Sequence, residues 1–144
     1  MIGTALLVVA LSMAVQSAYA EDPLDRRLKA IVHQGTDCGR VGKGGSPRSA
    51  VIACVTKQFT ANRPFRARVD GCGEDSCGGL GLVLEDMGGG RGGQFYVIDF
   101  DNIACGGQMA ADPYCGTVVR QCNRPRLVPE GDHLKVTCRN EYTF

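Results

Sequence analysis

The chain has 144 residues, and its 16 basic and 15 acidic side chains give a formal net charge of +1 at pH 7. This balance excludes a nucleic-acid binder that relies on a strongly basic surface, because no excess charge is present to neutralise phosphates. The length suits one domain with a hydrophobic core of its own.

Residues 1–20 predict an export signal. An apolar run over residues 5–15 has the length of a signal-peptide core and is too short to span a bilayer. Ala18 and Ala20 are small residues at the two positions that a signal peptidase reads, and a polar segment follows at once. We therefore expect cleavage after Ala20. Residues 21–144 would then be a single disulfide-rich domain, periplasmic or extracellular, with no membrane span.

Two helices are predicted next along the chain. Asp22 can cap the first, Pro23 suits its first position, and apolar residues recur at helical spacing as far as Val32. After a glycine-rich link, Ser46 and Pro47 repeat the pattern of a cap followed by proline, so the second helix is expected to start there.

The second helix carries an apolar stripe that should pack on a sheet, formed by Val51, Ile52, Val55 and Phe59. Cys54 lies beside this stripe, so we expect a disulfide to staple the helix. The segment 62–64 ends in proline and should terminate it.

After this helix the hydrophobic period changes from helical to two. Alternating apolar side chains predict strands at 65–70 and 80–85, and residues 94–100, apolar on both faces, predict a central strand. Two more strands are expected at 117–122 and 133–138. Strands that follow helices favour an α+β fold, with one or two helices packed on one face of an antiparallel sheet of about five strands, stapled by disulfides.

Three arginines, Arg63, Arg66 and Arg68, alternate with apolar residues at the start of the first predicted strand. This alternation places them on the solvent face of the strand. A phosphate site is less favoured.

Eight cysteines follow the predicted cleavage point: Cys38, Cys54, Cys72, Cys77, Cys105, Cys115, Cys122 and Cys138. An even number in an exported chain predicts a disulfide framework, here of four bridges. The spacings lack the matched close pairs of a zinc site. The connectivity stays open, although Cys72 and Cys77 could close a small loop.

Several short motifs resemble those of small exported bacterial proteins of uncharacterised function. They are Cys38-Gly39, the cysteine-bearing helix that ends in Arg63-Pro64-Phe65, Asp75-Ser76, the segment Tyr96 to Asp101, Cys105-Gly106-Gly107, Cys122 and Cys138. The resemblance runs from Cys38 onwards and implies no activity, so it assigns no functional residue. Cys72, Cys77 and Cys115 are additional to its pattern.

Carboxylates that could bind a hard cation occur in two places. Asp70, Glu74, Asp75 and Ser76 lie in one predicted loop, and Asp99, Asp101 and Asn102 lie at the end of the predicted central strand. Ca²⁺ prefers clustered carboxylate and carbonyl oxygens. The loop lacks the spacing of known calcium loops, and Asp and Ser are ordinary turn residues. A calcium-stabilised structural domain is therefore one alternative hypothesis.

The two histidines, His33 and His133, could act as general base and general acid in a small secreted hydrolase or nuclease. This hydrolase is the first alternative to the leading hypothesis, ahead of the calcium-stabilised domain. It requires both imidazoles to lie beside one cleft.

Other catalytic and cofactor motifs are missing from the sequence. No nucleophile motif surrounds Ser46, Ser49 or Ser76, and cysteines in disulfides cannot act as thiolates. The glycine-rich segments 42–45 and 88–93 match no phosphate-binding loop, so no cofactor is implied. The leading hypothesis is an exported non-enzymatic module that binds a protein or envelope partner, as an inhibitor or an envelope-associated factor would.

Overall fold

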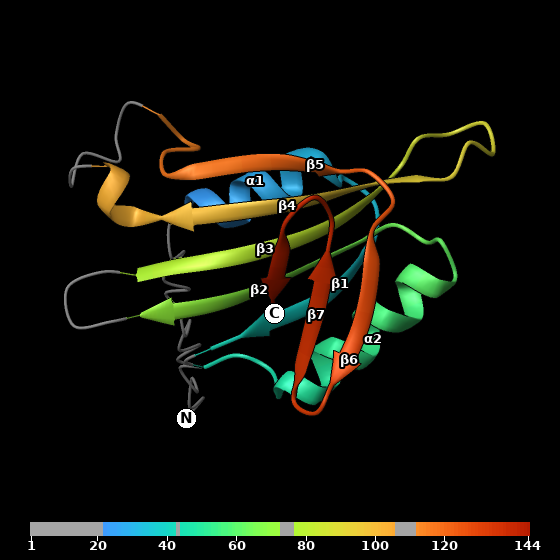
Figure 1. The fold of residues 1–144 in the computed structure, drawn as a ribbon. Coiled ribbons are helices and arrows are strands. Elements are labelled where there is room, and N and C mark those ends of the chain that lie inside the picture. Colours follow the sequence, from blue (N-terminus) through green and yellow to red (C-terminus); the bar gives the residue numbers. More distant parts are fainter. Residues whose placement is uncertain (1–21, 43, 73–76, 106–111) are drawn as a thin grey trace, which may run out of the picture.

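The computed structural model describes residues 22–42, 44–72, 77–105 and 112–144. Within these ranges the chain forms two α-helices, one short 3-10 helix (Asn102–Cys105) and two sheets (Figure 1). Neither α-helix in these ranges is long and apolar enough to cross a membrane. The predicted export signal lies outside the described residues.

The larger sheet has five strands in the spatial order β1-β2-β3-β4-β5. They are β1 Thr36–Val41, β2 Phe65–Cys72, β3 Cys77–Asp86, β4 Gly93–Asp101 and β5 Thr117–Cys122. The α+β class is confirmed, and β4 lies between two neighbours, as its apolar faces predicted. The sheet is mixed rather than wholly antiparallel. Strands β1 and β2 run parallel because helix α2 (Arg48–Thr60) connects them as a crossover.

A second, three-stranded antiparallel sheet follows along the chain, made of β6 Arg126–Glu130, β7 His133–Thr137 and β8 Glu141–Thr143. The strand predicted at 133–138 belongs to this sheet, not to the larger one. Strands β1, β6 and β8 were not predicted. Glycine interrupts the alternation in β1, proline interrupts it in β6, and β8 is too short to show a period.

Helix α1 (Pro23–Ile31) covers one face of the larger sheet (Figure 1). The Asp25 backbone N–H donates to the Asp22 carboxylate at 2.9 Å, which confirms the predicted cap. The helix approaches β3 closely at Gly81, where a Cβ atom would lie 2.8 Å from the Leu28 side chain. A larger residue at this position would force the end of the Leu28 side chain to shift, so glycine lets α1 pack close to the sheet.

Helix α2 and the small sheet cover the opposite face, so helices pack on both faces and not on one as predicted. The predicted stripe of α2 is confirmed: Val51, Ile52 and Val55 are buried, and the partly buried Phe59 packs edge-on against Phe95 with ring centroids 5.6 Å apart. The Cys38–Cys54 disulfide staples α2 to β1.

The predicted start of α2 is displaced by one residue. Pro47 is the cap residue itself, no side chain caps the helix, and the first helical residue is Arg48. The Ser46 backbone N–H instead donates to the Arg40 carbonyl at 2.7 Å, so Ser46 closes the loop that leaves β1. Ser46 is thereby positioned before the helix rather than at its cap.

A buried ion cluster attaches α1 to β2. Arg68 is only 4% exposed, so its predicted place on a solvent face is wrong. Its guanidinium donates to Asp22 at 2.8 and 2.9 Å, to Asp25 at 2.7 Å and to Asp70 at 2.6 and 2.9 Å. Arg40 of β1 also donates to the second oxygen of Asp70. Charged hydrogen bonds thus join the beginning of α1 to β2.

The pKa values in this cluster follow from its hydrogen bonds. Burial alone would raise the pKa of Asp22, but hydrogen bonds from Arg68 and the Asp25 backbone, with the charges of Arg68 and Arg40, outweigh it and lower that pKa. Burial alone would lower the pKa of Arg68, but the hydrogen bonds to Asp22, Asp25 and Asp70 raise it. Both groups therefore stay charged at neutral pH.

Candidate functional site

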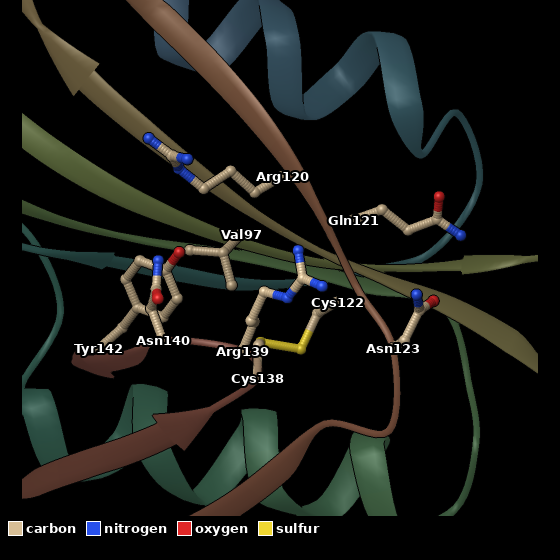
Figure 2. A pocket seen from close by; sticks show the side chains of 9 residues that line it. All are labelled: Val97, Arg120, Gln121, Cys122, Asn123, Cys138, Arg139, Asn140 and Tyr142. Carbon is tan, nitrogen blue, oxygen red and sulfur yellow. A yellow bond between two sulfur atoms is a disulfide. The ribbon is translucent and has the colours of Figure 1, made fainter.

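A pocket of about 550 Å³ opens where the end of β5 meets the β7–β8 turn (Figure 2). This volume is within the range of small-molecule sites in proteins. Nine residues line it: Val97, Arg120, Gln121, Cys122, Asn123, Cys138, Arg139, Asn140 and Tyr142. The larger sheet supplies one wall and the small sheet the other.

The Cys122–Cys138 disulfide builds the pocket, because it joins the end of β5 to the end of β7 with a Cα–Cα distance of 5.3 Å. The Cys138 backbone N–H donates to the Asn140 carbonyl at 2.9 Å, which closes the turn between β7 and β8. Arg139 lies at the tip of this turn, so its side chain is free of the sheet and can extend into the pocket. Figure 2 shows its guanidinium beside the disulfide, on the side toward β5.

Arg120 already has a partner on the larger sheet. Its Nε donates to the Asp99 carboxylate at 2.8 Å, and about half of each side chain is exposed. The hydrogen bond and charge of Asp99, with a smaller contribution from the Tyr142 hydroxyl, raise the pKa of Arg120. Water screens such an exposed pair, so the pair contributes little stability and mainly holds Arg120 in place.

Arg139 differs, because it is exposed and makes no ion pair with any described residue. Its planar guanidinium can bind both oxygens of a carboxylate at once. Asn123 and Asn140 add amide groups that donate and accept hydrogen bonds, and Tyr142 adds a hydroxyl and an aromatic face. The nine lining residues include no histidine and no carboxylate. Recognition of an anion is the chemistry that they offer.

The two histidines do not share a site. His33 follows α1 and lines a hollow with Glu85 and Asp86. His133, at the start of β7, lies 3.0 Å from the Asp132 carboxylate and lines a separate hollow on the small sheet. The structure therefore does not bring the two imidazoles beside one cleft.

The predicted calcium ligands are engaged elsewhere or lie outside the described residues. Asp70 accepts from two arginines, Asp101 accepts from the Ile103 backbone N–H at 2.9 Å, and Asn102 accepts from the Cys77 backbone N–H at 3.1 Å. Asp99 is bonded to Arg120, as described above. Residues 74–76 lie outside the described residues. In the part of the chain that is described, no three His, Cys, Asp or Glu side chains form a group that could hold a metal ion.

The structure shows two of the predicted disulfides, Cys38–Cys54 and Cys122–Cys138. Cys77 and Cys115 are also disulfide-bonded. The side chains of Cys72 and Cys105 lie outside the described residues. The complete set of four bridges, and the small loop between Cys72 and Cys77, therefore stay predictions.

Sequence reasoning missed Arg139, Asn140 and Tyr142 as site residues. The only local signal was that an arginine and an asparagine directly follow Cys138, which marks an exposed turn beside a disulfide. Their pocket depends on the pairing of Cys138 with Cys122, and that pairing cannot be read from spacing.

Together these features define a class: a small, disulfide-bonded α+β protein with a cationic, amide-lined pocket between two sheets. Comparisons with models of protein families, with curated proteins and with solved structures found no match. The chemistry of the pocket therefore has to support the functional proposal.

Proposed function

We propose that this chain is an exported binding module, periplasmic or extracellular, that recognises a carboxylate-bearing partner through the pocket at the Cys122–Cys138 disulfide. The observation that supports it is Arg139, a cation in a polar pocket with no carboxylate partner among the described residues. Disulfides persist in oxidising compartments, which supports export. An inhibitor or an envelope-associated factor would use such a module.

A carboxylate fits the pocket better than a doubly charged anion. Asp99 already offsets the charge of Arg120, so only one positive charge, that of Arg139, is left to be matched. The fork of one guanidinium matches the two oxygens of one carboxylate. The neighbouring amides of Asn123 and Asn140 can bind the polar atoms around the carboxylate, such as peptide groups.

A titration of ¹⁵N-labelled protein tests this proposal. A short capped peptide with one glutamate is expected to shift the backbone signals of residues 120–123 and 138–142, and Arg139→Gln should weaken binding about tenfold, since a charged hydrogen-bonded pair is lost. The matched control is Arg91→Gln, which removes an exposed arginine that lies in the connection between β3 and β4 and does not line the pocket. Equal binding of the glutamine analogue of the peptide would contradict the proposal.

The rival proposal, a hydrolase or nuclease that uses His33 and His133, predicts a different result. The binding module should show no nuclease, esterase or peptidase turnover above a blank, and His33→Ala and His133→Ala should leave the fold and peptide binding unchanged, because both side chains are exposed and outside the pocket. Turnover with a bell-shaped pH profile, lost in either variant while the circular dichroism is unchanged, would favour the hydrolase.

A further inference from the structure

Strand β5 forms an open edge of the larger sheet. It is the last strand in the spatial order, and no strand of the described ranges pairs with its outer side. Figure 1 shows that side of β5 facing away from the other strands. An edge strand presents unpaired backbone N–H and C=O groups, which can pair with another extended chain.

The other edges of the described sheets carry features that discourage such pairing. In β1 the register shifts between Asp37 and Arg40, and the Arg40 carbonyl already accepts a hydrogen bond from the Ser46 backbone N–H. Strand β6 contains Pro129, which cannot donate a backbone hydrogen bond. Strand β8 has only three residues. Bulges, prolines and short strands are the usual protection of exposed edges.

Strand β5 lacks this protection. It has six residues and no proline, and its side chains Val118 and Val119 are 49% and 38% exposed. Its one charged side chain, Arg120, is offset by Asp99. Two adjacent exposed valines on an open edge whose one charge is already paired favour a protein interface.

The open edge leads directly into the candidate pocket. Arg120 and Cys122 lie opposite Val97 and Phe95 of β4, on the face that the small sheet covers, and both line the pocket. Val118 shares this face, whereas Val119 lies opposite Ile98 on the α1 face. Side chains of a strand paired with β5 would lie directly across from these residues. One side chain of an added strand could therefore enter the pocket.

We propose that an extended segment of a partner protein pairs with β5 as a sixth strand and places an acidic side chain beside Arg139. An apolar side chain of this segment, two residues from the acid on the same face, would cover Val118. Another apolar side chain, on the opposite face, would cover Val119. This inference rests on the proposed function, because the acid uses the same pocket.

The charges on β5 favour a separate partner protein over a second copy of this chain. Strand β5 reads Thr-Val-Val-Arg-Gln-Cys and contains no acidic residue. The β5 strand of a second copy would therefore bring no carboxylate to Arg139. A partner segment with an acidic side chain would supply one.

The test starts with short random peptides displayed in a library and selected on the immobilised protein. Selected peptides are expected to carry Asp or Glu two residues from a valine, isoleucine or aromatic residue. The best peptide is then made in two N-methylated forms, with methyl groups on one or the other alternate set of residues. Only the set whose N–H groups face β5 should abolish binding, because the other N–H groups point away from the sheet.

The possible results separate this inference from the proposed function. If Arg139→Gln weakens binding about tenfold but the two methylated forms bind equally, the pocket function stands and strand pairing is overturned. If selected peptides contain no acid and Arg139→Gln has no effect, both are overturned.

Sedimentation of the protein without peptide should show a monomer. If the protein is instead a dimer and Val119→Lys dissociates it, the β5 edge binds a second copy of this chain. That result would overturn the proposal that a partner segment pairs with β5.

Discussion

Arg68→Met is expected to lower the free energy of unfolding by about 3 kcal/mol at pH 7, near the lower end of the penalty for removing one partner of a buried ion pair. Methionine keeps much of the aliphatic stem but leaves Asp22, Asp25 and Asp70 without their shared donor. Asp70 is nearly buried, whereas Asp22 and Asp25 retain some contact with water, which limits the loss. Urea unfolding of the wild type and the variant measures this loss of free energy.

The pH dependence identifies the cause of this loss. The pKa of Asp22 is lowered in the folded protein, so this carboxylate stabilises the fold above its unfolded pKa of about 4 and loses that effect as the pH falls through the lowered value. Without Arg68, burial raises this pKa against only the Asp25 backbone hydrogen bond and the charge of Arg40, so the pKa of Asp22 is lowered less than in the wild type. The difference between wild type and Arg68→Met should therefore shrink as the pH falls from 7 to about 3, because Arg68 stabilises Asp22 only while that carboxylate is charged.

A matched control lies two residues away on the same strand. Arg66 bonds to Asp37 at 3.0 Å, but the Asp37 side chain is more than half exposed. Arg66→Met should therefore cost less than about 1 kcal/mol. A loss for Arg68→Met that is equal at pH 7 and at about pH 3 would show that packing, and not charge, is responsible.

The second large effect concerns the two disulfides that the structure shows. Cys38–Cys54 and Cys122–Cys138 each join residues 16 positions apart. Loop-closure entropy therefore predicts the same loss of stability, about 3 kcal/mol, when either pair is replaced by alanine. Denaturant unfolding of the two double variants checks this equality.

Peptide binding should distinguish the two variants. Removal of Cys122–Cys138 frees the β7–β8 turn from β5 and separates the walls of the pocket, so the glutamate peptide should bind at least about tenfold more weakly. Removal of Cys38–Cys54 leaves the pocket intact, since that bridge lies between α2 and β1. Binding is measured well below both melting temperatures. An equal loss in both variants would mean that general destabilisation, not pocket geometry, controls binding.

Much of the fold is encoded in local patterns that a sequence shows directly. The cap at Asp22, the stripe of α2, the alternation in β2 and β3 and the apolar run of β4 each involve residues only a few positions apart. Their periods of 3.6 and 2 follow from backbone geometry, so burial of one face predicts the element. Strands β1, β6 and β8 were not predicted. A glycine in β1 and a proline in β6 interrupt the alternation of apolar and polar residues, and β8 is too short to show it.

The candidate site depends on contacts between residues distant in sequence. Arg68 reads as a surface residue of an alternating strand, and it is buried because Asp22, 46 positions earlier, is brought to it by α1. Arg139 became a pocket residue only because Cys138 pairs with Cys122 across two sheets. Local sequence patterns predict the two helices, the main strands and the cysteines available for cross-links. Which charges are buried and where the pocket lies depend on which elements pack together, and local periodicity carries no information about that packing.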